Sequence, residues 1–179
     1  LPKEGEIIEL PEELESLVAY QSILESGDYR ALAEPFNFRP ENGKVVGKHQ
    51  GAHYFTIGQR KGLQVGGTPL PLFVVGTDVQ TNHIYTGQGD EHPGLNRKAL
   101  FIKKEDIHWL REDLKLAPGN SERYEVRIRY RQDLVKATLY SEKEGLYILF
   151  DDLMKGISPG QFAAWYKGEE LIGSGVITQ

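Results

Sequence analysis

A short loop with two cations is the segment of this chain best suited to binding chemistry. Residues 56–63 read TIGQRKGL, so Gln59, Arg60 and Lys61 lie between two glycines. Glycine adopts backbone conformations that other residues avoid and lets a chain approach a ligand closely. Arg and Lys donate hydrogen bonds to anions, and Gln both donates and accepts. The composition favours a loop that contacts a phosphate-bearing ligand; the alternative is a structural corner whose cations are only solvated.

A second basic element is predicted as a strand over residues 123–131. Apolar and charged residues alternate there with period two, which is typical of a strand with opposite faces. The charged face carries Arg127, Arg129 and Arg131, about 6.5–7 Å apart at strand rise. That spacing is close to the separation of successive phosphates on a nucleic-acid strand. The alternative is an ordinary solvated strand face.

Composition limits the class of protein. With 179 residues, 39% hydrophobic and 26% charged, the chain fits one large or two small globular domains. No apolar run approaches the roughly 20 residues of a membrane span, so we expect no membrane contact. The absence of cysteine excludes disulfides and cysteine nucleophiles and fits a cytoplasmic location. We expect a fragment, because the chain starts at Leu1 and its only methionine is Met154.

The net charge of −5 first argues against a nucleic-acid partner, but its distribution changes that interpretation. Residues 1–43 hold three basic and ten acidic side chains, a net charge of −7. Residues 44–179 hold eighteen basic and sixteen acidic side chains, a net charge of +2. The larger part of the chain can therefore present a basic surface locally.

The chain is predicted to be mainly β, with one short helical insertion. Helical periodicity over residues 11–26 lies within an acidic segment, about 11–41, that reads as an excursion between two strands. We predict a central β domain over residues 1–95 and a closed six-stranded antiparallel β-barrel over residues 96–179, since six short open strands would leave exposed edges. The barrel strands are predicted at 99–107, 123–131, 135–140, 147–150, 162–166 and 172–177. Further short strands are predicted in the first domain, including one at 53–57.

Six motifs occur in one order along the chain. They are GAHYFTIGQRKGL at 51–63, YTGQG at 85–89, HP at 92–93, HW at 108–109, RYRQ at 129–132 and SPGQ at 158–161. Together they resemble the C-terminal half of the tRNA-specific 2-thiouridylases, formerly described as tRNA (5-methylaminomethyl-2-thiouridylate) methyltransferases. The match covers nearly the whole chain outside residues 11–41. The resemblance implies a small central domain followed by a β-barrel similar to those of translation factors.

The same resemblance implies an activity that this chain cannot perform alone. The family's enzymes adenylate the C2 oxygen of the anticodon wobble uridine and replace it with sulfur carried as a cysteine persulfide. ATP, with Mg²⁺, binds a further N-terminal domain through a Ser-Gly-Gly-Val-Asp-Ser type loop. Neither that loop nor any cysteine is present, so we expect no cofactor here and no activity of the chain by itself. The expected partners are tRNA, the N-terminal catalytic domain of the same enzyme and a sulfur-relay protein.

Residues are carried over individually from the resemblance. Arg129 and Tyr130 of the RYRQ motif match positions that contact tRNA, and Gln161 of the SPGQ motif matches another. Tyr130 falls on the predicted apolar face, where it either packs or, at the strand end, stacks on a base or bonds a backbone oxygen. The turn at 159–160 is expected to hold the Gln161 amide outward; the alternative is a turn-closing glutamine. The loop at 58–62, with Gln59, Arg60 and Lys61, is expected to face the catalytic domain and tRNA.

Other functions are weighed against tRNA docking. The five histidines form no convergent set of three or four ligands along the sequence, so we expect no metal site. A protein-interaction module, contacting the catalytic domain or a sulfur-relay donor with little tRNA affinity, is the main alternative. A free-standing hydrolase has little support, because no serine lies in the context of a nucleophile elbow.

Overall fold

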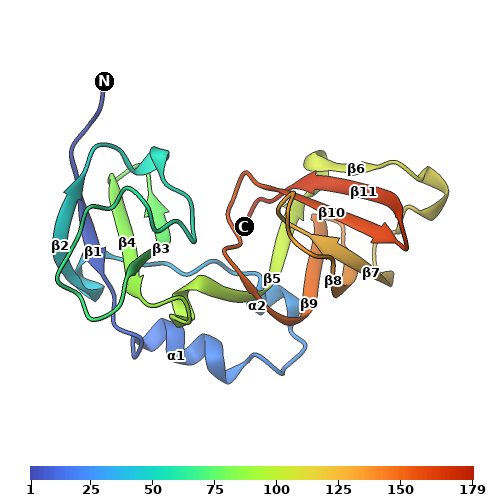
Figure 1. Cartoon of the computed structure of the whole chain (residues 1–179). Helices are drawn as coiled ribbons and strands as arrows, with labels where there is room; N and C mark the ends of the chain where they lie inside the picture. The colour runs from blue at the N-terminus through green and yellow to red at the C-terminus, as the bar shows by residue number, and fades with distance from the viewer. The chain divides into compact units, whose positions relative to one another are not determined.

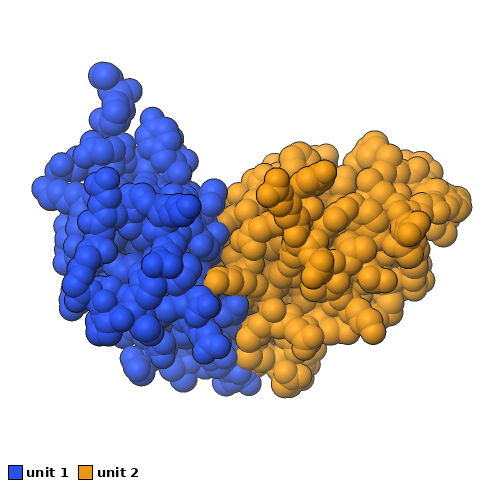
Figure 2. All heavy atoms as spheres, viewed as in Figure 1, with its two compact units in different colours: residues 1–22, 36–96 blue, residues 23–35, 97–179 orange.

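The chain forms two compact units, each built from two stretches of sequence. The computed structural model describes all 179 residues. Unit 1 comprises Leu1–Ser22 and Phe36–Asn96, and unit 2 comprises Ile23–Pro35 and Arg97–Gln179 (Figure 2). The prediction assigned all of residues 11–41 to the first domain, whereas the structure places Ile23–Pro35 in unit 2. No helix in either unit is both long enough and apolar enough to cross a membrane.

Unit 1 is built on a four-stranded sheet with strand order β2-β1-β4-β3 (Figure 1). Strand β1 pairs antiparallel with β2 and parallel with β4, and β3 pairs antiparallel with β4. Consecutive residues of a strand point to opposite faces. Ile7 and Ile8 of β1 are both buried, Ile7 in one apolar cluster and Ile8 in another. The sheet is therefore covered on both faces. The strands are β1 (Gly5–Glu9), β2 (Lys44–His49), β3 (Leu72–Asp78) and β4 (His83–Gln88).

The acidic segment joins two neighbouring strands. Since β1 and β2 pair antiparallel, the prediction of an excursion between two strands is confirmed. Its helix α1 (Glu15–Ser22) is shorter than the predicted 11–26 and buries Leu17 and Tyr20 in unit 1. The Tyr20 ring packs edge-on against Phe36, with centroids 5.0 Å apart. Apolar packing of one face therefore holds this short helix in place.

The strand predicted at residues 53–57 is absent, and that prediction is wrong. A 3-10 turn at Ala52–Tyr54 is followed by irregular chain up to β3. The Gly58 N–H donates to the Val74 carbonyl at 2.8 Å, and the Val74 N–H donates to the Gln59 carbonyl at 2.9 Å. These two bonds hold the loop against the edge strand β3 without forming a strand ladder.

Unit 2 is the predicted antiparallel barrel, with seven strands instead of six. The first predicted strand is divided by a 3-10 turn at Lys104–Asp106, which gives β5 and β6. The curled sheet has the order β5-β9-β8-β7-β10-β11-β6, so β5 and β6 are its edge strands and do not pair to close the sheet as predicted. Phe101 of β5 also exchanges backbone hydrogen bonds of 2.7–3.2 Å with Thr178 and Gln179, which protects part of the β5 edge. The strands are β5 (Asn96–Lys103), β6 (Ile107–Trp109), β7 (Ser121–Arg127), β8 (Val135–Ser141), β9 (Gly145–Lys155), β10 (Phe162–Lys167) and β11 (Glu170–Val176).

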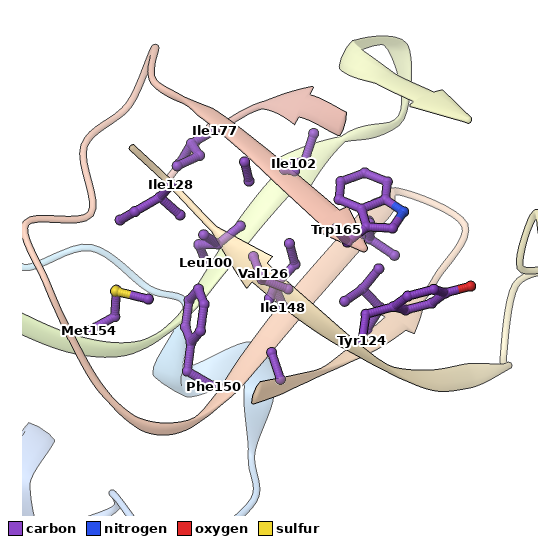
Figure 3. Close-up of a cluster of buried hydrophobic side chains, with 14 of the residues drawn as sticks. Leu100, Ile102, Tyr124, Val126, Ile128, Ile148, Phe150, Met154, Trp165 and Ile177 are labelled. Carbon is purple, nitrogen blue, oxygen red and sulfur yellow. The ribbon is translucent and has the colours of Figure 1, made fainter. Parts of the chain in front are cut away.

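A single apolar core fills unit 2 (Figure 3). Trp165 is fully buried, and its ring meets Trp109 edge-on with centroids 5.3 Å apart. Gly173 lies against the indole, where an added Cβ would approach the ring to 2.6 Å. The close contact between β10 and β11 at this point therefore requires glycine. Inward side chains of the strands complete a rigid scaffold for the loops at the ends of the barrel.

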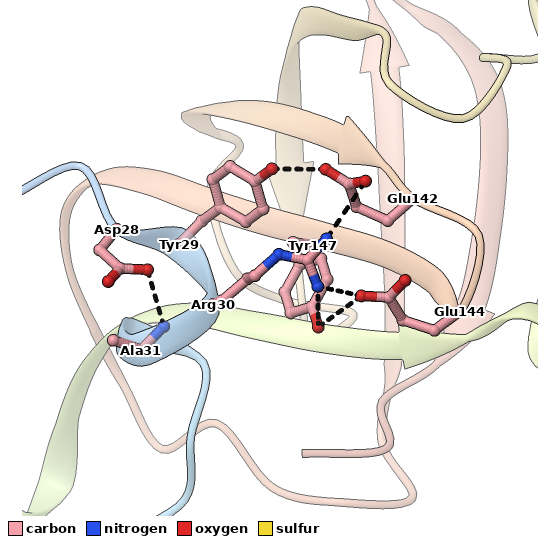
Figure 4. Close-up of polar contacts among 7 residues, drawn as sticks. All are labelled: Asp28, Tyr29, Arg30, Ala31, Glu142, Glu144 and Tyr147. Atoms are coloured by element: carbon pink, nitrogen blue, oxygen red, sulfur yellow. Dashed lines mark hydrogen bonds and ion pairs between the residues drawn. The ribbon is translucent and has the colours of Figure 1, made fainter.

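The segment Ile23–Pro35, which we call the strap, packs on unit 2 (Figure 4). It contains the short helix α2 (Tyr29–Leu32), whose Asp28 cap accepts a hydrogen bond from the Ala31 N–H at 3.1 Å. The Tyr29 ring stacks on Tyr140 with centroids 4.1 Å apart, and its hydroxyl donates to Glu142 at 2.5 Å. That hydrogen bond is the main cause of a raised pKa at Tyr29.

Ion pairs and a buried leucine complete the attachment of the strap. Arg30 pairs with Glu142 at 3.2 Å and with Glu144, and its guanidinium lies 5.2 Å from the centre of the Tyr147 ring. Leu32 is fully buried. Part of the segment predicted as an acidic insertion is thus structural for the barrel.

Candidate nucleic-acid interface

Strand β7 ends at Arg127, so the predicted strand over 123–131 is wrong in its last four residues. Ile128 turns into the core, and its N–H donates to the Gln132 side-chain oxygen at 3.0 Å. The Gln132 N–H donates in turn to the Arg129 carbonyl at 3.1 Å. The glutamine therefore closes a tight loop between β7 and β8. The three arginines do not form a row on one strand face, and the spacing argument no longer applies to them.

Arg129 ties this loop to the end of β9. Its guanidinium donates to the Lys155 carbonyl at 3.1 Å and to the Gly156 carbonyl at 2.8 Å. Gly156 has a φ of +71°, and an added Cβ would lie 2.0 Å from the Arg129 Nη2 atom. Any larger residue at this position would be strained by the positive φ and would have to displace the guanidinium. We call these two hydrogen bonds the Arg129 latch; its partners are neutral carbonyls, so the positive charge of the guanidinium is not neutralised.

The two residues after the latch project into solvent. The Tyr130 side chain is 90% exposed, and it makes no hydrogen bond and no ring contact within the chain. The prediction that Tyr130 lies on an apolar strand face is therefore wrong, because the strand has already ended. Arg131 is also exposed and has no carboxylate within ion-pair distance. A free aromatic ring beside an unpaired cation suits base stacking and phosphate contact.

The second predicted tRNA-contacting position lies in the turn between β9 and β10. The Gln161 N–H donates to the Ser158 carbonyl at 3.3 Å, and the Gln161 carbonyl accepts from the Ile177 N–H at 2.7 Å. Its side chain is half-buried, and the side-chain oxygen is buried and accepts no hydrogen bond from the protein. The expectation of an outward amide is therefore wrong for the oxygen atom.

The sequence analysis did not identify Phe162, the residue after Gln161, as a candidate. Phe162 begins β10 and is 67% exposed, whereas Ala163 and Trp165 point into the core. Strand alternation was the available signal, since Phe162 occupies an outward position of a strand whose alternate residues Ala163 and Trp165 are buried. Strand β10 pairs antiparallel with β7, with Ala164 opposite Arg127. The start of β10 therefore lies beside the end of β7, where the loop that carries Tyr130 (residues 128–132, the Tyr130 loop) leaves the sheet.

The remaining predicted residues, Gln59, Arg60 and Lys61, lie in unit 1. The Gln59 side chain accepts from the Thr56 N–H at 3.3 Å and donates to the Lys61 carbonyl at 2.8 Å. The amide therefore braces the loop and is not free for a ligand. Arg60 and Lys61 are exposed and have no ion pair, and Arg60 lines a cavity of about 310 Å³. The loop thus presents two unpaired cations.

The other two β7 arginines differ in their partners. Arg127 donates to the Tyr166 hydroxyl at 2.9 Å, and its guanidinium lies 4.9 Å from the centre of that ring. Arg123 forms a bidentate ion pair with Asp151 at 2.6 and 2.7 Å. That pair lowers the pKa of Asp151. Arg127 therefore keeps an unneutralised charge, and Arg123 does not.

The buried histidines have structural partners. His92 lies between the Leu10 carbonyl, 3.1 Å from Nε2, and the Gly94 N–H, 3.1 Å from Nδ1. His49 makes equivalent contacts with Asn82 and Gly51 at 3.0 Å. Burial lowers the pKa of both rings. No group of three or more His, Cys, Asp or Glu side chains is placed to hold a metal ion.

Comparison with known proteins gives two family matches. The family described as "Aminomethyltransferase beta-barrel domain" matches residues 100–177, within unit 2. The family described as "tRNA methyl transferase PRC-barrel domain" matches residues 33–88. The two matches together cover the candidate loops of both units. They leave most of the acidic segment outside.

Curated relatives match the chain over more of its length. Proteins named tRNA-specific 2-thiouridylase MnmA from Flavobacterium johnsoniae and Christiangramia forsetii are each 51% identical, and the alignments cover 99% and 98% of this chain and 45% of each relative. The protein of the same name from Karelsulcia muelleri is 44% identical over 83% of this chain and 38% of its own length. The chain thus spans less than half the length of these relatives. Near-complete coverage means that the acidic segment has a counterpart in the first two.

Proposed function

Because the chain belongs to the tRNA-specific 2-thiouridylase family and matches the C-terminal part of its members, we propose that it docks tRNA for an enzyme that thiolates the anticodon wobble uridine. In this proposal the adenylation and sulfur-transfer steps belong to parts of the enzyme outside this chain. The residues present here do not suit ATP with Mg²⁺, since they include neither the expected nucleotide loop nor a cluster of metal ligands. A thiolate nucleophile is also absent. In this proposal the chain binds and orients RNA. We propose that this tRNA docking takes place in the cytoplasm.

The β7–β8 loop carries the proposal. Tyr130 exposes a ring that makes no hydrogen bond or ring contact in the protein, and the Arg129 latch fixes the backbone from which that ring projects. An aromatic held in this way stacks on an unpaired base at small entropic cost, because little loop ordering accompanies binding. Arg131 follows directly and supplies a phosphate contact. In this proposal Arg129 positions the loop and adds uncompensated charge.

The Gly58–Gly62 corner is proposed as a second phosphate contact, on unit 1. Arg60 and Lys61 are exposed without carboxylate partners, and Gln59 holds their loop through two side-chain hydrogen bonds. Unit 1 as a whole carries six basic and ten acidic side chains, a net charge of −4. RNA contact on this unit is therefore confined to the corner and sensitive to salt.

Anisotropy titration of labelled tRNA with the chain, at several salt concentrations, tests the proposal. We expect Tyr130→Ala to weaken binding by about 1–3 kcal/mol, or about 5- to 150-fold, as one lost stacking contact. Arg131→Ala should reduce the slope of log K against log salt by about 0.7–0.9. Lys143→Ala is the matched control, since it removes one exposed cation from the β8–β9 turn. Absent binding, or equal loss in all three variants, would refute the proposal.

An acidic surface favours a second candidate, a protein-interaction module. Glu12 and Glu13, before helix α1, and Glu15 at its first position are exposed, and the whole of unit 1 is net negative. Such a surface suits a basic partner, either the catalytic domain of the same enzyme or a sulfur-relay protein. In that case Glu12→Lys/Glu13→Lys would abolish co-purification with the partner, while Tyr130→Ala would leave RNA affinity unchanged.

A further inference from the structure

The outward face of β7 and β10 has an unusual combination of side chains. Ala163 and Trp165 are buried, so Phe162 and Tyr166 both point outward from β10. On the paired strand β7, Arg127 lies opposite Ala164, and Glu125 lies opposite Tyr166. On the next strand, Lys136 of β8 lies opposite Glu125. Two aromatic rings and two cations therefore share one side of three adjacent strands, which we call the outer β7–β10 face.

A cavity of about 250 Å³ opens at the far end of this face, away from the Tyr130 loop. Its lining includes Arg123, Lys136, Tyr166 and Lys167. The Lys167 ammonium lies 4.7 Å from the centre of the Tyr124 ring, which also lines the cavity. Aromatic rings beside ammonium and guanidinium groups match the stacked base and backbone phosphate of a nucleotide.

We propose that the outer β7–β10 face carries a single RNA strand onward from the Tyr130 loop to this cavity. Phe162 and Tyr166 stack on bases, and Arg127 and Lys136 contact phosphates. The inference rests on the proposed function and adds binding residues to it. Phe162 and Tyr166 are four residues apart, about 13 Å along the strand. That distance exceeds the roughly 3.4 Å rise between stacked bases, so the two rings contact the bases of different nucleotides.

Charge on the face supports an RNA partner. Arg127 is bound only to the Tyr166 hydroxyl, and Lys136 forms no ion pair, so both keep their charge for phosphate. Arg123 is neutralised by Asp151, and Lys167 lies 3.4 Å from Glu122. Glu125 is the one carboxylate between the two unpaired cations, and it has no ion pair of its own.

Glu125 gives the sharpest test, because its removal should improve binding. We expect Glu125→Gln to tighten tRNA binding measurably, while the control Glu105→Gln, on the turn before β6, leaves it unchanged. Lys136→Ala should weaken binding about two- to fivefold and reduce the salt slope, and Lys143→Ala should do neither. Glu125 and Lys136 are both exposed, so we expect their substitution to leave the fold intact.

Stacking is tested at Tyr166. We expect Tyr166→Ala to lose at least fivefold in affinity and Tyr166→Phe, which keeps the ring, to recover most of it. If Tyr130→Ala weakens tRNA binding but every variant of the outer face binds like the parent chain, the inference is overturned and the proposed function stands. If the unaltered chain does not bind tRNA, both fail. Loss of co-purification with the catalytic domain, at unchanged RNA affinity, would assign the face to a protein and also overturn the inference.

Discussion

The Arg129 latch predicts a specific cost for Gly156→Ala. Two glycines of unit 2 have nearly equal φ angles, +71° at Gly156 and +73° at Gly27. A Cβ at Gly27 meets nothing within 4 Å, whereas a Cβ at Gly156 would lie 2.0 Å from the Arg129 guanidinium. In both alanine variants the left-handed backbone strain therefore lowers the free energy of unfolding by about 1–2 kcal/mol. Only Gly156→Ala also displaces the latch.

The size of the difference follows from the two hydrogen bonds. Each is made by a charged donor to a carbonyl, at 3.1 and 2.8 Å, in an exposed or partly buried setting. A net contribution of about 1 kcal/mol for each bond is expected there. Gly156→Ala should thus lower the free energy of unfolding by about 3–4 kcal/mol, and Gly27→Ala by about 1–2 kcal/mol. Once Arg129→Ala has removed the clash, adding Gly156→Ala should cost only the strain.

Urea denaturation followed by tryptophan fluorescence measures this difference. Both tryptophans, Trp109 and Trp165, lie in the core of unit 2, so the signal reports the unit that contains the latch. Equal losses for Gly156→Ala and Gly27→Ala, within about 0.5 kcal/mol, would refute the reasoning. Additivity of Gly156→Ala and Arg129→Ala in the double variant would refute it as well, since the two changes act on one contact.

Three further results are expected. Leu32→Ala should destabilise unit 2 by about 2–5 kcal/mol in the same urea assay, because Leu32 of the strap is fully buried. Tyr130→Ala should change the unfolding free energy by less than about 0.5 kcal/mol while weakening tRNA binding, since its ring is 90% exposed. Burial lowers the pKa of His49 and His92, so the unfolded state binds protons first, and the urea midpoint by circular dichroism should fall as pH drops from about 7.5 to 5.5.

Each of these expectations has a control and a contrary outcome. Leu153→Ala, at a half-exposed position on β9, should cost much less than Leu32→Ala, and equal costs would mean that the strap does not pack on the barrel. A destabilised Tyr130→Ala variant would show that the ring has a packing role. A urea midpoint that stays constant or rises on acidification would contradict the neutral, buried state of the two histidines.

Much of the barrel could be predicted from the sequence, because strands that bury one face leave a period-two pattern. The predictions at 135–140, 162–166 and 172–177 correspond to β8, β10 and β11. The same pattern failed at the end of β7. Arg129 and Arg131 continue the alternation in sequence, but the Gln132 side chain accepts from the Ile128 N–H and closes a loop. A side-chain hydrogen bond of this kind leaves no periodic signal.

The site was predicted less completely than the fold. Motif similarity selected Tyr130, and the structure gives it a more exposed place than the strand prediction allowed. The Gln161 amide was expected to point outward, yet its side-chain oxygen is buried. Gln59 was expected to contact a ligand, yet its amide bonds its own loop. Phe162 and the strap were missed, since exposure on a strand and contacts between segments distant in sequence depend on tertiary structure.

Hydrogen exchange of the chain with and without tRNA, read by mass spectrometry, tests the central claim most directly. Contact at the two barrel loops should slow the exchange of backbone amides at residues 128–132 and 158–162, while amides at 142–145 in the β8–β9 turn exchange at an unchanged rate. Protection that is absent from both loops, or confined to the acidic face of unit 1, would contradict RNA docking by the barrel.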